Sequence, residues 1–193
     1  GDSVRTFATA EEMFDSGVID ACIIAVPHYA HCKLAIACME RGIHVMVEKP
    51  AGVYGLEVRR MNEIADQHPD VVVGMMFNQR TNILFRKAHD IVSSGELGEL
   101  KRTVWIITNW YRKQCYYDSG GWRATWSGEG GGVLLNQAPH NLDLLQWICG
   151  MPSSLYAKCD EGKYHHIEVE DDATLMMRYD NGMTAVFITS TGE

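Results

Sequence analysis

The 193-residue sequence lacks the features that mark several large classes of protein. No apolar run approaches the length needed to cross a membrane, and no basic segment followed by an apolar one opens the chain as a signal peptide would. No block of five or more like charges occurs, and the net charge is -8, which argues against a nucleic-acid-binding surface. We therefore expect a globular, acidic protein of the cytoplasm that binds neither membrane nor nucleic acid.

Cysteine is present, but without the spacing of a cofactor site. The six cysteines are scattered along the chain and form no Cys-x-x-Cys pair. Most of them lie in apolar segments, so we interpret them as reduced core thiols rather than as a disulfide framework or a zinc site. The chain also contains no internal repeat and no low-complexity tract.

The first part of the chain alternates apolar runs with helical patterns. The apolar runs predict strands that are buried on both faces, at residues 21–26, 43–47 and 71–76. Helices are predicted at residues 9–17, 30–42 and 55–67. Thr9 and Glu12 form a capping box for the first helix, and the third should bury a stripe of Leu56, Met61, Ile64 and Ala65. This alternation predicts a parallel sheet with right-handed crossovers.

The pattern changes near residues 74–81 and then predicts a second architecture. A strand at 100–110 and a hairpin with Asp180-Asn181-Gly182 at its turn indicate an antiparallel sheet. Helices are predicted at 82–93 and 141–149, the latter with Pro139 near its first turn. We therefore expect an α/β domain at 1–77 followed by an α+β domain at 78–193, whose open, mostly antiparallel sheet carries helices on one face.

The stretch Glu48-Lys49-Pro50 follows the predicted strand 43–47 directly. The proline ends the strand, which places a carboxylate and an ammonium at its carboxyl end, where open α/β sheets bind their ligands. A lysine there could carry a proton, donate to a substrate hydroxyl or bind an anion. The alternative is a solvated Glu–Lys pair in a loop.

His140 lies at the start of a predicted helix. The partial positive charge at the amino end of a helix disfavours the protonated imidazolium ring, so His140 could act as a base near neutral pH. The alternative is a histidine that only bonds to nearby backbone.

Two further motifs allow both a functional and a structural interpretation. Gly130-Gly131-Gly132 lets the backbone approach a substrate or another strand closely, but it does not match a phosphate loop. Trp122-Arg123 combines an aromatic ring that could stack on a ligand with a guanidinium that could bind a phosphate or a carboxylate. Alternatively, the two side chains only pack within an ordered loop.

A cluster of histidines and carboxylates follows later in the chain. Its members are consecutive on strand-like sequence and would alternate between faces, so they should not converge on a metal. We interpret the cluster as a solvated turn and strand edge: His165, His166, Glu168, Glu170, Asp171 and Asp172.

Together these motifs resemble the family of glucose-fructose oxidoreductase, inositol dehydrogenase and their relatives (Gfo/Idh/MocA). Glu-Lys-Pro alone is a weak signal, but the combination is specific. The matching pieces occur in the family's order and span nearly the whole chain: Ile24–Pro27 with His31, Gly42–Pro50, Ser94–Glu99, Trp122-Arg123, Gly131–Asp143, Trp147 and Gly150.

The resemblance implies a Rossmann-like NAD(P)-binding domain followed by a substrate and oligomerisation domain, with hydride transfer between NAD(P) and a carbinol carbon of a sugar or polyol. Lys49 and His140 would be the acid/base pair at the substrate hydroxyl, with Asn136 beside them. No metal is implied. The implied cofactor-binding residues are Ala25, Val26, Pro27, His28, His31, Glu48, Lys49, Pro50, Asn78, Trp122 and Arg123.

The sequence departs from the family pattern in two respects. Many members have aspartate where this chain has Asn136, and asparagine can orient a hydroxyl but holds no charge. The family's first strand, its Gly-x-Gly-x-x-Gly turn and the acidic ribose ligand are absent, so we interpret the chain as a partial one, and the choice between NAD and NADP stays open.

Two alternative functions therefore stay open. One is a non-catalytic sensor of the same fold that binds NAD(P) or a sugar. The other is a relative that uses tightly bound NAD for glycoside cleavage or epimerisation. The variable loop 111–128 does not identify the substrate.

The predicted strand around Val104–Ile107 is apolar and aromatic and therefore needs a cover. Either the domain's own helices or a second subunit would pack against these apolar side chains. From the resemblance we expect a homodimer or homotetramer formed through this sheet.

The missing glycine-rich turn generates the first prediction. We expect the 193 residues alone to be inactive and to bind NAD(H) or NADP(H) weakly or not at all, because the pyrophosphate would sit on that turn. Isothermal titration of the purified chain with each cofactor tests this. A dissociation constant in the nanomolar-to-micromolar range would contradict it.

Overall fold

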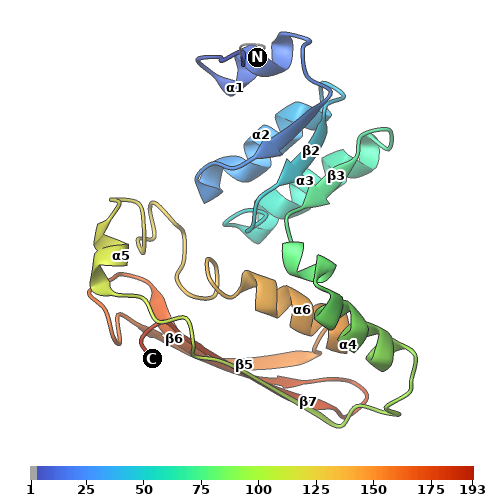
Figure 1. The fold of residues 1–193 in the computed structure, drawn as a ribbon, viewed down its shortest axis with the longest axis vertical. Helices are drawn as coiled ribbons and strands as arrows, with labels where there is room; N and C mark the ends of the chain where they lie inside the picture. Colours follow the sequence, from blue (N-terminus) through green and yellow to red (C-terminus); the bar gives the residue numbers. More distant parts are fainter. Residues whose placement is uncertain (1–3) are drawn as a thin grey trace. The chain divides into compact units, whose positions relative to one another are not determined.

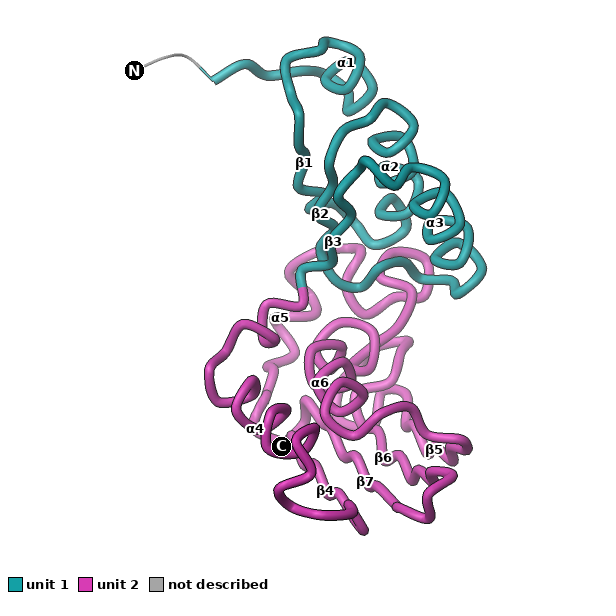
Figure 2. Tube along the Cα trace, turned by 90° about the vertical axis from the view of Figure 1, so that its right-hand side faces the viewer, with its two compact units in different colours: residues 1–76 teal, residues 77–193 magenta. Residues whose placement is uncertain are grey.

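The structure, a computed structural model, describes residues 4–193. The chain forms two compact units, which divide between Met76 and Phe77 (Figure 2). We refer to them as unit 1 and unit 2. No helix within residues 4–193 combines the length and the apolar character that a bilayer crossing requires.

Unit 1 is a small α/β layer structure (Figure 1). Its three strands are parallel and hydrogen-bonded in the order β1-β2-β3, which confirms the predicted parallel sheet. Figure 2 shows α2 and α3 on one face of this sheet. The elements are α1 Ala10–Asp15, β1 Ala21–Ile24, η1 His28–Ala30, α2 His31–Met39, β2 His44–Val47, α3 Gly55–Gln67 and β3 Val73–Met75.

The strands of unit 1 are not buried on both faces, as the apolar runs had suggested. Ile24, Val45 and Val47 point into the core beneath the helices. On the opposite face Ile23 is 66% exposed, and Val72, which precedes β3, is 68% exposed. The prediction was wrong because helices of the described chain cover only one face of the sheet.

The helix signals of unit 1 were largely correct. The Thr9 hydroxyl accepts from the Glu12 amide at 3.2 Å, and the Glu12 carboxylate accepts from the Ala8 amide at 3.1 Å, one residue before the cap. In α3, however, Leu56 is exposed, whereas Met61 is buried. Leu56 precedes Met61 by five residues, so the two side chains point about 140° apart around the helix axis. Val58 rather than Leu56 therefore completes the buried stripe.

Unit 2 packs helices on one face of a four-stranded sheet (Figure 1). The strand order is β4-β7-β6-β5, with β4 and β7 parallel and the other two pairs antiparallel, so the sheet is mostly antiparallel as predicted. The elements are η2 Asn78–Thr81, α4 Ile83–Ser93, β4 Arg102–Ile107, α5 Gln114–Asp118, α6 Pro139–Cys149, β5 Ser154–Glu161, β6 Glu170–Arg178 and β7 Thr184–Ser190.

The predicted hairpin joins β6 and β7. The Gly182 amide donates to the Tyr179 carbonyl at 3.0 Å, and Asn181 Oδ1 accepts from the Met183 amide at 3.0 Å. Gly182 has a φ of 83°, which favours glycine at this position. Strand β4 is shorter than predicted, and the short helix α5 lies in a segment for which the sequence predicted only a loop.

The strand β4 divides its side chains between two environments. Ile107 is buried in the core, and Trp105 packs against that core. Val104 and Ile106, which alternate with them, are 57% and 59% exposed. The helices of unit 2 therefore cover one face of β4 and leave the other face of the strand exposed.

The cysteines are free thiols, but not all of them belong to the core. Cys32 and Cys38 are buried, and burial raises the pKa of Cys38 to about 12. Cys115 and Cys159 are exposed. The prediction of core thiols is therefore wrong for these two, because α5 and the sheet-edge strand β5 are poorly covered elements.

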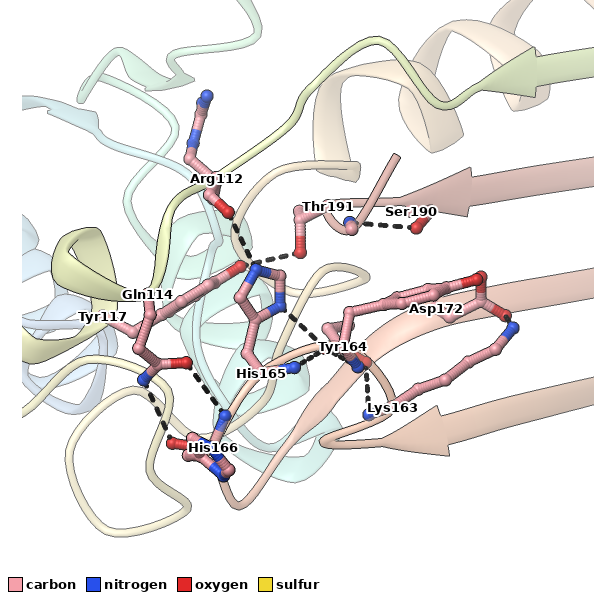
Figure 3. A network of polar contacts seen from close by, with 12 residues as sticks. Arg112, Gln114, Tyr117, Lys163, Tyr164, His165, His166, Asp172, Ser190 and Thr191 are labelled. Carbon is pink, nitrogen blue, oxygen red and sulfur yellow. Dashed lines mark hydrogen bonds and ion pairs between the residues drawn. The ribbon is translucent and has the colours of Figure 1, made fainter.

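Part of the histidine–carboxylate cluster is a buried network rather than a solvated turn (Figure 3). His165, Glu170 and Asp171 are buried, whereas His166 and Glu168 are exposed as expected of a solvated turn. Asp171 is fully buried, and its carboxylate accepts from the amides of Lys163, Tyr164 and His165 at 2.9, 2.9 and 3.0 Å. His165 Nδ1 lies 2.8 Å from the same carboxylate. The ring's Nε2 lies 2.8 Å from the Arg112 carbonyl, so His165 joins Asp171 to the segment before α5.

For the buried members the prediction was wrong because the chain does not stay extended here. Gly162 has a φ of 54°, and residues 162–169 lie outside any strand. The turn brings His165 back towards Asp171, and it brings His166 to Gln114, whose side chain accepts from the His166 amide at 2.9 Å (Figure 3). Alternation between strand faces does not apply to such a segment.

The network generates a stability prediction. We expect Asp171→Asn to lower the free energy of unfolding by about 2–4 kcal/mol, because an amide cannot accept at all the positions that the carboxylate now serves. Urea unfolding of the purified chain measures the change. The control is Asp180→Asn at the exposed hairpin turn, for which we expect a change within about 0.5 kcal/mol. Equal effects of the two substitutions would contradict a structural role for the buried carboxylate.

Candidate functional site

In unit 1 the candidate residues lie at the carboxyl ends of β1 and β2. These strands run in register, with Ile24 opposite Val47, so the loops that follow leave the same edge of the sheet. The Glu48 amide donates to the Ile24 carbonyl at 3.0 Å, which extends the pairing beyond β2.

His31 connects the two loops. Its ring is buried, with Nδ1 2.7 Å from the Pro50 carbonyl and Nε2 2.8 Å from the Val26 carbonyl. His28 is also buried, and its ring meets the His31 ring edge-on at 5.8 Å between centroids. Because both of its ring nitrogens face backbone carbonyls, His31 braces the loops from inside.

The Glu-Lys-Pro turn is packed rather than freely solvated. Pro50 is buried, Lys49 and Glu48 are half-buried, and the Lys49–Pro50 peptide bond is cis. The Lys49 amide donates to the Glu48 carboxylate at 3.3 Å. The stretch Ala25–Pro27 on the neighbouring loop is exposed. Unit 1 thus brings eight predicted site residues to one sheet edge: Ala25, Val26, Pro27, His28, His31, Glu48, Lys49 and Pro50.

In unit 2 the candidate catalytic residues Asn136 and His140 follow the triple glycine. Glu170 of β6 fixes this segment, since its carboxylate accepts from the amides of Gly132 and Leu134, both at 3.0 Å. Its carbonyl accepts from the Val133 amide at 2.8 Å. A side chain at position 132 would overlap the Glu170 backbone, so the glycine permits close approach of another chain segment, one of the two alternatives that the sequence left open.

Asn136 and His140 come next along the chain. His140 lies in the first turn of α6, which begins at Pro139. The Phe77 ring meets the His140 ring edge-on at 6.1 Å between centroids. Asn136 Nδ2 donates to the carboxylate of Glu129, a residue that is 3% exposed. The predicted cofactor residue Asn78 lies in η2 directly after Phe77.

An ion pair attaches η2 to the same helix. Arg80 binds Asp143 with two hydrogen bonds, from Nε at 2.8 Å and from Nη2 at 2.6 Å. The hydrogen bond to Asp143 raises the pKa of Arg80 above its usual value. The guanidinium also lies 5.2 Å from the centre of the Trp147 ring. Asp143 is one turn beyond His140, so this pair fixes the start of α6 against η2.

Trp122 and Arg123 pack with a neighbouring aromatic side chain. The Arg123 guanidinium lies 4.6 Å from the Trp122 ring centre and 4.7 Å from that of Tyr116, and it donates to the Tyr116 hydroxyl at 2.9 Å. These contacts fit the interpretation of an ordered loop. Within residues 4–193, no three histidine, cysteine or acidic side chains form a group that could hold a metal ion.

The sequence did not reveal the roles of Glu129, Glu170, Arg80 and Asp143. Arg80 and Asp143 are 63 positions apart, so no local pattern joins them. Glu170 belongs to the acidic stretch that we had interpreted as solvated. Glu129 stands directly before the triple glycine, and that adjacency was the one local signal available.

Two family models match the chain. The GFO/IDH/MocA C-terminal domain matches residues 85–193. The oxidoreductase family with an NAD-binding Rossmann fold matches residues 2–76.

Individual relatives agree with the family models. The rhizopine catabolism protein MocA of Rhizobium meliloti is 25% identical over 151 residues, which are 78% of this chain and 44% of that protein. The myo-inositol 2-dehydrogenase of Thermotoga maritima is 25% identical over 193 residues, which are 96% of this chain and 54% of that protein. The chain spans about half the length of the curated relatives it matches.

A solved structure matches both units. The WlbA dehydrogenase from Bordetella pertussis, in complex with NADH and UDP-GlcNAcA, has a TM-score of 0.90 and 28% identity, over 98% of this chain and 54% of that one. Since a family model covers more than half of the sequence, this chain belongs to the Gfo/Idh/MocA family of oxidoreductases.

Proposed function

We propose that this chain is part of an oxidoreductase that transfers a hydride between NAD(P) and a hydroxyl-bearing carbon of a sugar, a polyol or a related small molecule. The observation that carries the proposal is the braced sheet edge of unit 1. There the turn with Lys49 and the exposed stretch Ala25–Pro27 leave the same ends of parallel strands, where such sheets bind nucleotides. Relatives named as inositol dehydrogenases, one of them from Bacillus subtilis with NADP(+) in its name, support the substrate class.

In this proposal, side chains of this chain accept and return the proton of the substrate hydroxyl. A hydride leaves carbon only as the hydroxyl proton is taken up, so a base must reach that oxygen. We assign Lys49 and His140 as the acid/base pair. Asn136 orients the hydroxyl through its amide and does not itself accept the proton.

We assign the cofactor to the residues that the family resemblance implies. Ala25, Val26 and Pro27 would line its adenosine and ribose side, and Glu48, Lys49 and Pro50 would lie towards its nicotinamide end. The braced edge fits such a ligand, because His31 and the buried His28 fix the two loops before a ligand arrives. Asn78, Trp122 and Arg123 complete the proposed set. The bound cofactor supplies the hydride acceptor or donor.

One observation favours a second candidate. Asn136 is neutral, and the carboxylate nearest to it in the described contacts is the buried Glu129, which binds its amide. A sensor that binds NAD(P) or a sugar without turnover would not need a charged group at position 136. Ligand binding that persists without turnover, and that is indifferent to Lys49→Ala, would favour the sensor.

The acid/base assignment predicts the effect of two substitutions. In the complete gene product that contains this chain, we expect Lys49→Ala and His140→Ala each to lower kcat by about 100-fold or more, since each removes a proton-transfer group. NADH or NADPH absorbance across a panel of sugars and polyols measures the turnover. Lys33→Ala and His68→Ala, which lie outside the proposed site, should leave it unchanged. Full turnover in either site variant would refute that residue's role.

We further propose that the protein is cytoplasmic and self-associates through the outer face of the unit 2 sheet. The support for self-association is that Val104, Ile106 and Met176 are each more than half exposed on that sheet.

We expect Ile106→Asp to convert a dimer or tetramer into a monomer in sedimentation velocity. Leu97→Asp, at an exposed leucine outside the sheet, should not change the sedimentation. A wild-type protein that sediments as a monomer would disprove the proposed interface.

A further inference from the structure

Glu129 is a buried carboxylate that the proposed reaction does not yet use. It is 3% exposed, and its own amide donates to the Thr125 carbonyl at 3.0 Å. One carboxylate oxygen accepts from the Ala124 amide at 2.6 Å. The other accepts from Asn136 Nδ2. A carboxylate removed from water to this degree depends on such donors, because their loss leaves its charge uncompensated.

The contact also fixes the orientation of Asn136. An amide side chain presents a donor on one branch and an acceptor on the other. Since Nδ2 donates to Glu129, Oδ1 is the branch that turns away from this carboxylate. The backbone around Asn136 is held as well, because its amide donates to the Gly132 carbonyl at 2.9 Å and Glu170 fixes Gly132.

We infer that Glu129 is a positioning residue for the proposed reaction: it holds Asn136 so that Oδ1 is offered to the substrate hydroxyl, four residues before His140. This inference rests on the proposed function. It also accounts for asparagine at position 136. An aspartate there would place two carboxylates in contact, and two such groups cannot both stay ionised without a large cost.

The inference predicts that the carboxylate at position 129 and the amide at position 136 can exchange places. Positions 129 and 136 together hold one carboxylate and one amide. Moving the carboxylate to position 136 should be harmful while Glu129 remains, and it should be tolerated once position 129 carries the amide. In the exchanged pair the glutamine nitrogen would donate to the aspartate, and the glutamine oxygen would still accept from the Ala124 amide.

The test is a four-protein cycle in the complete gene product: wild type, Glu129→Gln, Asn136→Asp and the double variant. We expect Asn136→Asp to lower kcat by about tenfold or more and the unfolding midpoint by about 5 °C. Glu129→Gln should lower kcat by about threefold to tenfold, because one of its two acceptor oxygens is lost. The double variant should recover kcat to within about threefold of the wild type, with KM for the cofactor unchanged throughout.

Glu168→Gln is the matched control. Its carboxylate accepts only a backbone amide in the described contacts, that of Trp126 at 3.2 Å, and the residue is exposed. It should leave both kcat and the unfolding midpoint unchanged. An Asn136→Asp variant as active and stable as the wild type would overturn the inference. A double variant no better than Asn136→Asp alone would overturn it as well.

The two readouts separate this inference from the proposed function. If the wild type turns over no sugar or polyol, the proposed function fails and the positioning role fails with it. The unfolding midpoints of the four proteins then still test whether Glu129 and Asn136 are in contact. A double variant that regains the stability lost in Asn136→Asp supports the Glu129–Asn136 pair, and a double variant that does not regain it refutes the pair. If the wild type turns over, recovery of stability without recovery of kcat refutes positioning and leaves a purely structural contact.

Discussion

The arrangement of unit 2 depends on buried carboxylates that accept backbone N–H groups. An amide outside a helix or strand loses its hydrogen bonds to water on burial and needs another acceptor. Glu170 supplies one for Gly132 and Leu134. Asp171, the next residue, does the same for three amides of the turn that includes His165. Glu129 accepts the Ala124 amide. Segments without regular structure thereby acquire fixed positions, and these include the loop that leads to His140.

Unit 1 fixes irregular backbone with a histidine ring rather than a carboxylate. The buried His31 ring lies between the Val26 and Pro50 carbonyls, with Nε2 2.8 Å from the first and Nδ1 2.7 Å from the second, and so links the two loops that follow the strands. In both units, then, a side chain from a regular element, His31 of α2 or Glu170 of β6, fixes irregular backbone beside the candidate residues. Such support holds candidate groups in one geometry before a ligand arrives, which is a general requirement for efficient chemistry.

The sequence predicted the regular elements well because their signals are local. The apolar spacing of α3 and the Asp-Asn-Gly turn between β6 and β7 depend on residues close together in the chain. It failed where burial depends on distant partners. Ile23 is exposed although it lies in an apolar run, because only one face of its sheet is covered in the described chain. Leu56 is exposed because helix phase, not apolar character, decides burial.

The candidate site was predicted only in part, for the same reason. Lys49 and His140 stood out through their motifs, whereas the residues that hold their surroundings carry no motif. Arg80 and Asp143 pair across 63 positions, and Glu170 reaches back 38 positions to Gly132. Family resemblance identifies the groups that could react. The structure adds the hydrogen bonds that give those groups fixed neighbours.

Amide hydrogen exchange of the loop at residues 129–136 tests the central claim about buried carboxylates most directly. If Glu170 fixes this loop, the Gly132 and Leu134 amides should exchange about 100-fold or more slowly than unprotected amides. They should exchange about tenfold faster or more in Glu170→Gln, whereas the amides in the middle of α6 keep their rates. Exchange of Gly132 and Leu134 at unprotected rates in the wild type, or unchanged rates in the variant, would contradict the account.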